Sequence, residues 1–567
     1  MEGVAGRLID RRAAGQWTMR KACVVAWFAL TVPLFLLNRC DGLLAADARN
    51  LDRAAVTGHI RISLLMPVSV LLRPHESKRV VITNISHQAA SVVAQVYSHM
   101  QNVTVSLSRF FAVDASYTSS SAGVVLMLQP AAEHATFYIR AGEEEVSATL
   151  FALPYSAQDP IPGACNLEFA LENDPNLHLM FNVYETTVSF APANLGVSRG
   201  LLPPACDVRT DSHTRWRLTY DLYQYFLPEN DLSVTSLLTG MRKMSSVQSI
   251  EVNGLKVTTI SSTQQTRLYG NSYVGIGVIY NVIVRDPLLK TSASYAPVST
   301  YTCNMSFKGY KCKNPDETFI YIQVLCTIIG IYGLLLCLTG HRIFEAEFLF
   351  FGFLIFAFIS FVVVTRYSSL DFIKRFAVLV GMGLFGGLLM TLVRWRFGLP
   401  VICVTFVGFV LGFLVAAIIF FTPLANVNLF RNDLNFWMIY AFITLVIPTV
   451  LLPFTKTLNI ISCALVGSYA VIIAVGVYIY SSLTYIILNV IKRAIHPDFA
   501  KVYSNAPFQR TDYILTSVWV FLFVNGVALQ FTLARNRSTF PPCLYQKWKR
   551  RSTEIGERTP LLHPPEM

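Results

Sequence analysis

The stretch FIYIQVLCTIIGIYGLLLCLT, residues 319–339, decides the fold class of this chain. It holds no charged side chain. At about 1.5 Å of rise per residue, a helix of this length crosses the roughly 30 Å hydrocarbon core of a bilayer. Six comparable apolar stretches follow, each of about 18 residues or more. The sequence therefore predicts seven membrane-spanning helices, placed at 319–339, 347–364, 376–394, 398–421, 435–454, 458–479 and 513–534.

The composition of the whole chain also indicates a membrane protein. Of its 567 residues, 53% are hydrophobic and 14% are charged, whereas soluble globular proteins carry about 25% charged residues. The apolar excess lies in 319–534, while residues 49–318 mix charges with short apolar runs. We attribute the net charge of +12 to basic residues near the cytosolic leaflet and expect no nucleic-acid partner. Basic residues gather in the tail at Arg535, Arg537, Lys547, Lys549, Arg550 and Arg551.

The start of the chain predicts a signal peptide at 1–48. Arg20 and Lys21 precede an apolar run from Ala22 to Leu37, and small residues follow, in the order of a cleaved secretory signal. A retained signal anchor is the alternative. A lumenal or extracellular amino end and an odd number of spans put the tail, 535–567, in the cytosol. The basic residues of the loops between spans support this orientation only in part.

Four cysteines of the predicted ectodomain, Cys165, Cys206, Cys303 and Cys312, predict two disulfides. Three pairings are possible. We favour Cys165–Cys206 and Cys303–Cys312, because each of these pairs is near in sequence and closes a separate loop. Since no histidine or further thiol stands at ligand spacing, the sequence indicates no metal site.

Glycosylation sequons lie in the same region as these cysteines. Asn84, Asn102 and Asn304 all precede the first span, and we expect each of them to carry a glycan. A fourth sequon, at Asn536, follows the last span and stays unmodified if the tail is cytosolic.

The predicted ectodomain is β-rich. Short runs of Val, Phe, Tyr and Thr bounded by turn residues have the density of β-sandwich modules. A proline-rich connector at 160–163 suggests a boundary near 157, so we predict modules at 49–156 and 157–318. One helix is expected at Leu232–Met244, with Asp231 as its N-cap. The predicted strands are Arg79–Asn84, Val103–Leu107, Gly123–Leu128, Thr136–Ile139, Val146–Leu153, Leu167–Leu171, Leu179–Phe190, Trp216–Phe226, Ile250–Ile260, Val278–Val284 and Ser294–Tyr301.

The apolar cores of the seven spans contain no Asp, Glu, Lys or His, and Arg394 and Asp512 sit at span ends. Proton-coupled carriers and voltage sensors use ionisable groups inside the membrane, so this pattern argues against such mechanisms. Asn459, Asn525 and Gln530 are the neutral polar residues that could line a pore. We interpret them as hydrogen bonds between helices.

Two glycine pairs predict close helix packing. Gly383 and Gly387, like Gly408 and Gly412, are spaced to lie on one face of a helix. We interpret both pairs as packing within the bundle, with a dimer face as the alternative. The segment Ser482–Arg493 has one apolar helical face and predicts an interfacial helix or an extension of the sixth span.

The sequence shows no convincing catalytic constellation, and we predict no enzymatic activity and no cofactor. Residues 196–200 fit the pattern G-x-S-x-G. Prolines flank them where a nucleophile elbow needs a strand before and a helix after, so a loop is expected. In the tail, Glu557, Leu561 and Leu562 form an acidic dileucine pattern, which predicts sorting by clathrin adaptors.

Several sequence segments resemble those of a known family. They are DPIPG at 159–163, CNLEF at 165–169, FAPANLG at 190–196, YQYFLPENDL at 223–232, GVIYNVIV at 277–284 and ERTPLL at 557–562. In these segments the chain resembles the seven-transmembrane superfamily member 3 family of multi-pass membrane proteins. The resemblance implies a seven-span protein associated with cell survival under stress, including the unfolded-protein response, and with insulin secretion. It implies no defined enzymatic activity or ligand.

Together these observations predict a non-enzymatic seven-span glycoprotein of the plasma membrane that cycles through endosomes and lysosomes. It contacts membrane lipid and binds an unidentified ligand or protein partner through its ectodomain. One alternative is a receptor coupled to G proteins, although the third span ends in Val393-Arg394-Trp395-Arg396 rather than in an Asp-Arg-Tyr type. The other is a channel or transporter, which the uncharged spans disfavour.

Overall fold

The computed structural model describes residues 59–99, 101–182, 185–207, 213–229, 231–262, 266–302, 304–306, 311–313, 319–397, 400–423, 427–496 and 507–535. The predicted signal peptide, Asn536 and the tail motif fall outside these ranges. So do Cys303 and the side chain of Cys312, and with them the second predicted disulfide.

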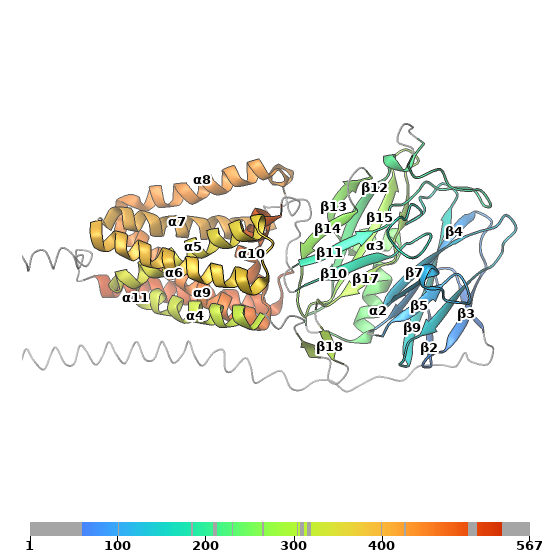
Figure 1. The fold of residues 1–567 in the computed structure, drawn as a ribbon, viewed down its shortest axis with the longest axis horizontal. Helices are drawn as coiled ribbons and strands as arrows, with labels where there is room; N and C mark the ends of the chain where they lie inside the picture. Colours follow the sequence, from blue (N-terminus) through green and yellow to red (C-terminus); the bar gives the residue numbers. More distant parts are fainter. Residues whose placement is uncertain are drawn as a thin grey trace, which may run out of the picture. The chain divides into compact units, whose positions relative to one another are not determined.

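Residues 59–156 form a sandwich of a five-stranded and a four-stranded sheet (Figure 1). The strand orders are β1-β3-β8-β5-β6 and β2-β9-β4-β7, with β1 and β3 parallel and the other pairs antiparallel. Their inward side chains, among them Phe137, Ile139 and Leu150, form one apolar core. The strands are β1 His59–Ser63, β2 Val68–Leu72, β3 Ser77–Thr83, β4 Ala89–Ser98, β5 Val103–Ser106, β6 Ser116–Ser119, β7 Ser121–Met127, β8 Ala135–Ala141 and β9 Val146–Ser156.

A second sandwich follows, with sheet orders β10-β11-β14 and β13-β12-β15-β16, and with β17 paired to β15. Strand β15 lies in the middle of its sheet and is buried along almost its whole length, with apolar side chains at 278–280 and 282–284. Two short helices, α2 and α3, precede β13, and a hairpin of β18 and β19 comes last. The elements are β10 Leu177–Phe181, β11 Glu185–Phe190, β12 Thr219–Phe226, α2 Val234–Lys243, α3 Val247–Asn253, β13 Leu255–Ser261, β14 Arg267–Asn271, β15 Val278–Asp286, β16 Thr291–Ser294, β17 Val298–Thr300, β18 Asn304–Ser306 and β19 Lys311–Lys313.

Strand β4 joins the two sandwiches into one packed body, and all ten of its residues are buried. Successive side chains of a strand point to opposite faces. Val92, Ala94 and Val96 accordingly lie in the core of the first sandwich. Val93 and Tyr97 lie in the core of the second. The second sandwich therefore covers the outer face of this sheet along β4, whereas Ser69 and Leu71 of β2 stay exposed.

The connector between the sandwiches is packed against its surroundings. Ile161 exchanges two backbone hydrogen bonds with Asn194, at 2.9 and 3.1 Å. Gly163 takes a φ of +70°, and a Cβ there would come within 1.7 Å of the Asp174 carbonyl oxygen, so only glycine fits. These contacts fix the segment to the second sandwich, so it cannot act as a loose linker.

Most predicted strands coincide with strands of the structure, but four predictions were wrong. Ser294–Tyr301 is not one strand, because it holds only the last residue of β16 and, after a break at 295–297, β17. Leu167–Leu171 is not a strand, because the Asn166 side chain accepts hydrogen bonds from the Glu168 and Phe169 amides and folds the segment into a turn. Leu179–Phe190 is a hairpin of β10 and β11 rather than one strand. Ile250–Ile260 begins as the end of α3 and becomes a strand only after Gly254.

The predicted helix at Leu232–Met244 is present as α2, but its N-cap is Ser233 and not Asp231. The Ser233 hydroxyl accepts a hydrogen bond from the Ser236 amide at 3.2 Å. Asp231 instead accepts from the Ser233 amide at 3.0 Å, just before the helix begins.

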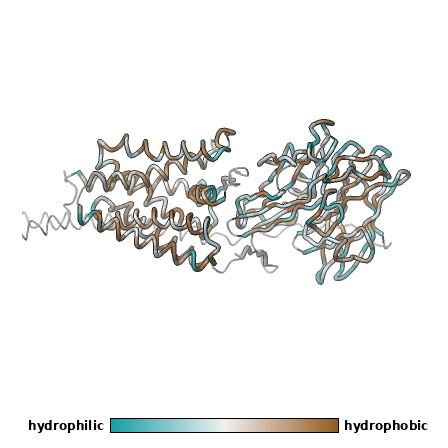
Figure 2. Tube along the Cα trace, turned by 45° about the horizontal axis from the view of Figure 1, so that its top comes forward, coloured by the Kyte–Doolittle hydropathy of each residue, from teal (hydrophilic) through white to brown (hydrophobic). Residues whose placement is uncertain are grey.

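From Phe319 onward the described residues are mostly helical, and their helices are largely apolar, as the predominance of brown in this part of Figure 2 shows. Six apolar segments are long enough to cross a membrane, and one of them, Asp433–Ile479, has 47 residues. That length is more than twice the roughly 20 residues of one crossing, and a short turn at 452–454 divides it into two helices. The described residues thus contain seven long helices. Their bounds are α4 Phe319–Thr339, α5 Phe344–Tyr367, α6 Phe372–Phe397, α7 Pro400–Phe421, α8 Asp433–Leu451, α9 Thr455–Ile479 and α11 Arg510–Ala534.

Helix α9 is the central helix of the bundle. It packs against α4, α7 and α11 and buries side chains around most of its circumference. Helices that are apolar all round but only partly buried, such as α6, leave the rest of their surface to lipid.

The four glycines singled out by the sequence all lie against neighbouring helices of the bundle. A Cβ at Gly387 would meet the Leu349 carbonyl oxygen of α5 at 2.6 Å, and one at Gly383 would meet Phe353. On α7, a Cβ at Gly412 would meet the Thr444 carbonyl oxygen of α8 at 2.4 Å, and one at Gly408 would meet Pro448. Their position fits packing within one bundle, where small residues let backbones approach.

Two glycines of α6 form a matched pair for testing this packing. Gly387→Ala is expected to destabilise the bundle by about 1–3 kcal/mol, because a backbone oxygen cannot yield to the added methyl group. Gly381→Ala adds the same methyl where nothing lies within 4 Å, so it should leave stability unchanged or raise it slightly. Thermal unfolding of both variants in detergent measures the difference, and equal midpoints would contradict the packing role of Gly387.

Candidate functional site at the junction of sandwich and bundle

The short helix α10, Tyr485–Ile495, is the element on which the junction is built. Helix α9 ends because Tyr480 takes a left-handed conformation with φ of 54°, so the chain turns there instead of continuing. The Asp512 carboxylate of α11 fixes this turn, accepting hydrogen bonds from the Ser481 hydroxyl and the Ser482 amide, both at 2.8 Å. Of the two alternatives predicted for Ser482–Arg493, the extension of the sixth span was therefore wrong, and the segment forms a separate short helix.

The polar side of α10 is covered by the second sandwich. The Asn271 amide at the end of β14 donates to Asn489 Oδ1 at 2.9 Å. Lys492 Nζ donates to Asn271 Oδ1. The two bonds form a chain of hydrogen bonds that runs from Lys492 through Asn271 to Asn489. The Tyr485 hydroxyl donates to the Ser272 carbonyl oxygen. Of the surfaces of Asn271, Asn489 and Lys492 only 3%, 8% and 5% remain exposed, so these bonds are shielded from water.

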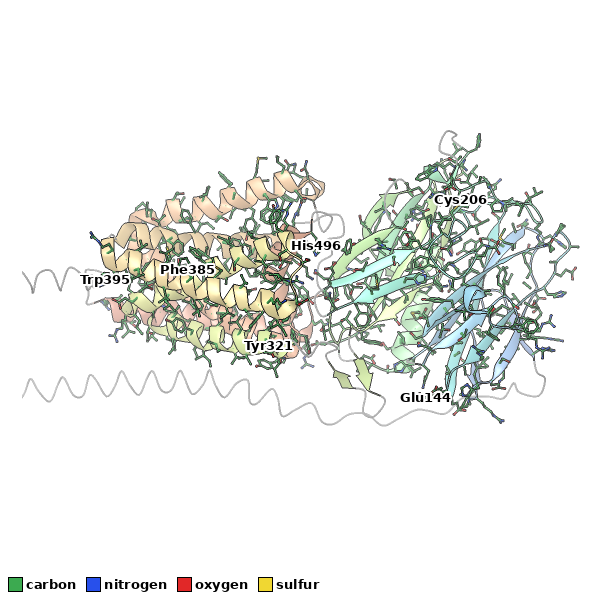
Figure 3. All side chains as sticks on the ribbon, in the orientation of Figure 1. Glu144, Cys206, Tyr321, Phe385, Trp395 and His496 are labelled. Atoms are coloured by element: carbon green, nitrogen blue, oxygen red, sulfur yellow. A yellow bond between two sulfur atoms is a disulfide. The ribbon has the colours of Figure 1, made fainter. Side chains whose placement is uncertain are left out.

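Further contacts surround this chain of hydrogen bonds. The Glu229 carboxylate accepts from the Thr511 hydroxyl at the start of α11. His496, labelled in Figure 3, stacks on Tyr269 with ring centroids 6.0 Å apart and approaches the Glu185 carboxylate at 3.5 Å. The sandwich therefore contacts both α10 and α11 through polar groups.

An apolar layer continues through the same junction. Phe319 of α4, Val477 of α9 and Tyr485 belong to the same buried cluster as the core of the second sandwich. The Tyr273 and Tyr485 rings lie 5.4 Å apart. Protein interiors are close-packed, so the second sandwich cannot move at this junction without moving α10 as well.

Lys492 is the electrostatically unusual group of the junction. Removal from water lowers the pKa of its ammonium group from 10.5 to about 7, and the Glu185 carboxylate opposes this effect only partly. Lysine at this position can therefore change its charge between neutral and mildly acidic pH. Lys492 lies outside the membrane-spanning helices, because α10 has only 11 residues and is not one of the candidate spans.

The sequence draws attention to this segment but does not reveal the junction. Within Ser482–Arg493 the amphipathic pattern predicts that polar residues off the apolar face lie against water or lipid head groups. In the structure Asn489 and Lys492 face a protein partner that lies more than 200 residues earlier in the chain. The spacing of polar and apolar residues within the segment gives no sign of a partner so far away in the sequence.

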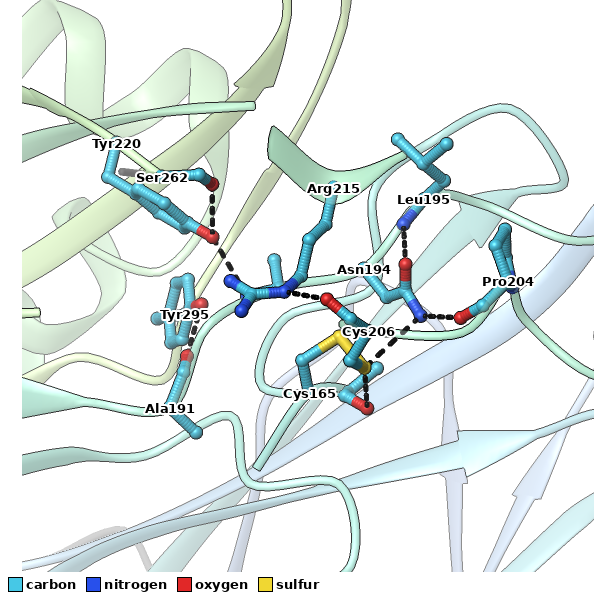
Figure 4. The surroundings of a disulfide bond; sticks show 12 residues. Cys165, Ala191, Asn194, Leu195, Pro204, Cys206, Arg215, Tyr220, Ser262 and Tyr295 are labelled. Atoms are coloured by element: carbon cyan, nitrogen blue, oxygen red, sulfur yellow. Dashed lines mark hydrogen bonds between the residues drawn. A yellow bond between two sulfur atoms is a disulfide. The ribbon is translucent and has the colours of Figure 1, made fainter. Parts of the chain in front are cut away.

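Cys165 and Cys206 are joined by a disulfide, the pair that the sequence favoured. Figure 4 shows how the surrounding loop is held in the second sandwich. Arg215 Nε donates to the Cys206 carbonyl oxygen at 2.7 Å, and the Asn194 amide donates to the Pro204 carbonyl oxygen at 2.6 Å. The bond thus fixes an otherwise irregular segment to the core.

The predicted glycan acceptors lie in the first sandwich and the last hairpin. Asn84 and Asn102 are exposed in loops, and Asn304 stands in β18. We expect Asn84→Gln, Asn102→Gln and Asn304→Gln each to raise gel mobility by one glycan, and Asn536→Gln to leave it unchanged. Removal of all glycans with a glycosidase is the control, and a shift with Asn536→Gln would contradict the predicted orientation of the tail.

The segment 196–200 is a loop, as its flanking prolines indicated. Arg199 crosses from it to the first sandwich and donates to the Ala89, Ser86 and Ala132 carbonyl oxygens at 2.6, 2.7 and 3.0 Å. This arginine holds the two sandwiches together, and Ser198 beside it has no strand–turn–helix around it. In the described ranges no three His, Cys, Asp or Glu side chains gather as a metal ion would require.

The neutral polar residues of the spans have different roles. Gln530 of α11 donates to the Leu336 and Cys337 carbonyl oxygens of α4, at 3.2 and 2.8 Å. Asn459 of α9 donates to Glu347 of α5 at 3.2 Å. Asn525 donates only within its own helix in the hydrogen bond that the structure shows, to Phe521. Two of the three therefore connect helices.

The structure shows a buried acidic side chain at the end of one predicted span. Glu347 lies in the first turn of α5, where a hydropathy pattern places the edge of a span. Its side chain nevertheless has no exposed surface, because α9 and α6 cover that end of the helix.

Three family models match the chain. They are "TM7SF3-like, N-terminal immunoglobulin-like domain" over residues 58–155, "TM7SF3-like, second immunoglobulin-like domain" over 160–306 and "TM7S3/TM198-like domain" over 326–531. The first two correspond to the two sandwiches and the third to the helices.

Full-length relatives agree with these matches. The chain is 40% identical to mouse transmembrane 7 superfamily member 3 over 90% of its own length and 91% of the relative's. It is 41% identical to the human protein over 86% of its own length and 85% of the relative's. The chain is therefore a multi-pass membrane protein with two immunoglobulin-like domains that belongs to the transmembrane 7 superfamily member 3 family.

Proposed function

We propose that this chain is a non-enzymatic membrane glycoprotein that modulates cell survival under stress, including the unfolded-protein response, by coupling a ligand or protein partner of its sandwiches to its helices. A role in insulin secretion is proposed on the same ground. The observation that carries the proposal is the buried chain of hydrogen bonds from Lys492 through Asn271 to Asn489.

This chain of bonds supports coupling for a physical reason. Strand β4 and Arg199 fix the first sandwich to the second, and β14 fixes the second to α10. A partner bound at the far sandwich therefore has a continuous packed route to the bundle through β14 and α10.

Survival of cells under stress tests the proposal. Cells lacking the chain receive wild type, Asn489→Leu or Asn525→Leu, and endoplasmic-reticulum calcium stores are then emptied to induce stress without blocking glycosylation. We expect wild type and Asn525→Leu to protect equally, since Asn525 lies away from the junction. Asn489→Leu should lose protection at equal surface abundance, because it removes the acceptor of the Asn271 amide.

The outcomes separate the parts of the proposal. Protection by Asn489→Leu equal to wild type would overturn the coupling through α10. Failure of the wild-type chain to protect would overturn the survival function itself.

We propose that the protein resides in the plasma membrane and cycles through endosomes and lysosomes by binding clathrin adaptors. The support is the dileucine pattern of the tail, in which an acidic residue stands four places before two leucines. Leu561→Ala combined with Leu562→Ala is expected to raise surface abundance about twofold or more, measured with an antibody to the sandwiches on intact cells. Unchanged distribution would make the pattern a chance match.

A further inference from the structure

We propose that Glu347 and Asn459 form a proton-binding site inside the helical bundle, in which a neutral Glu347 carboxylic acid and the Asn459 carboxamide are joined by two hydrogen bonds. The site lies where the first turn of α5 meets the first turns of α9. It is separate from the junction on α10 and goes beyond the proposed function.

The first observation is the complete burial of the pair. Glu347 has 0% and Asn459 1% of its surface exposed. Asn459 Nδ2 donates to Glu347 Oε2 at 3.2 Å. The two planar head groups therefore already touch along one edge, away from bulk water.

The second observation concerns the other oxygen of each group. Among the described residues, Glu347 Oε1 and Asn459 Oδ1 are both buried without a hydrogen-bond partner. A buried acceptor without a donor costs roughly 1–3 kcal/mol. An ionised carboxylate has no proton to donate, and neither has the carboxamide oxygen. The two oxygens without partners therefore cannot form a hydrogen bond with each other.

One proton on the carboxyl group would give both of these oxygens a hydrogen-bond partner. A proton on Oε1 turns this atom into a donor, and Asn459 Oδ1 is an acceptor that lacks one. The terminal torsions of Glu and Asn side chains are broad, so a small rotation can align the second edge with the first. The result is a carboxylic acid and a carboxamide paired through two hydrogen bonds, with no charge to desolvate.

The charged and titratable neighbours are compatible with a neutral acid. The Arg394 guanidinium of α6 lies over the Phe344 ring at 4.0 Å and the Phe348 ring at 5.5 Å, so aromatic faces already contact its charge. The Cys463 thiol of α9 faces the Glu347 carboxyl group, and Cys337 of α4 lies beside that thiol. No further acidic side chain of the described helices interacts with this carboxyl group.

A metal cation fits the site less well than a proton. Hard cations bind six or more oxygens, whereas the pair offers two oxygens without a partner. The positive charge of Arg394 acts on the same carboxyl group and would repel a cation.

The position of the pair also shows which side of the membrane supplies the proton. Helix α4 crosses once after the sandwiches, and the turn at 340–342 then leads into α5. The first turn of α5 therefore lies at the membrane face opposite to the sandwiches, and the proton exchanges with that compartment.

The test uses the full chain purified in detergent. Glu347→Gln is neutral at every pH and keeps a donor for Asn459 Oδ1, and Glu345→Gln is the matched control on an exposed residue of the same turn. Infrared spectra should show a protonated-carboxyl band that Glu347→Gln removes and Glu345→Gln retains. The thermal midpoint of wild type should fall relative to that of Glu347→Gln as the pH rises, because Lys492 contributes equally to both, and the difference between the two should vanish at low pH.

Three results would overturn the proposal. The carboxyl band could be unaffected by Glu347→Gln. Glu347→Gln could be less stable than wild type at all pH values, which would indicate an ionised Glu347 paired with Arg394. Sodium or another cation could stabilise wild type but not Glu347→Gln, which would make the site a cation site.

Discussion

Lys492→Met is expected to remove most of the pH dependence of stability that the junction contributes. Folding lowers the pKa of Lys492 from 10.5 to about 7, so between these values the unfolded chain holds a proton that the folded chain lacks. The stability contributed by this group therefore rises as the pH increases from 7 towards 10.5, and below pH 7 the full cost of burying the charge is present. Since one pKa unit corresponds to about 1.36 kcal/mol, the whole difference is worth roughly 5 kcal/mol.

Unfolding of wild type and Lys492→Met in detergent, followed from pH 6 to pH 9, measures this effect. The slope of the unfolding free energy against pH should be smaller for the variant, even though methionine leaves Asn271 Oδ1 without that donor. Lys374→Met is the control, because that lysine is exposed at the start of α6. Equal slopes for wild type and Lys492→Met would contradict the lowered pKa. In acidic compartments a protonated Lys492 should weaken the contact between sandwich and α10.

Replacement of both Cys165 and Cys206 by serine is expected to destabilise the second sandwich by about 4 kcal/mol. The disulfide closes a loop with a sequence separation of 41 residues, and loop closure of this length restricts the unfolded chain by about that amount. Proteolysis should consequently cut the irregular segment around Pro204 in the variant and spare it in wild type.

Limited proteolysis of the full chain in its membrane, read with an antibody to the first sandwich, measures this effect. Cys326→Ser is the control, since Cys326 is a free thiol in α4. Identical cleavage rates for wild type and the double serine variant would contradict a stabilising role for the disulfide.

The features that the sequence predicted are those set by local properties. The length and apolarity of a span are read from consecutive residues, so the amino-acid order alone was enough to place the seven helices. The Cys165–Cys206 pair followed from proximity in the chain. The cap of α2 was misplaced by two residues because Asp231 and Ser233 are both good caps, and only the backbone path decides between them.

The features that the sequence did not predict depend on contacts between distant segments. Lys492 and Asn271 are 221 residues apart, and Glu347 and Asn459 are 112 residues apart. A lysine on the polar side of α10 and a glutamate at the edge of α5 both look water-exposed in a hydropathy pattern. Their burial becomes visible only once the second sandwich and α9 are placed against them.

The two-sided burial of β4 has a consequence for biosynthesis. The first sandwich leaves the ribosome before the second, and until the second is complete the row of Val93, Tyr97 and Phe151 has no cover. A large exposed apolar row of this kind binds chaperones or aggregates. Maturation of this protein should therefore depend on the folding capacity of the compartment that receives it, and fragments ending before the second sandwich should be retained and degraded.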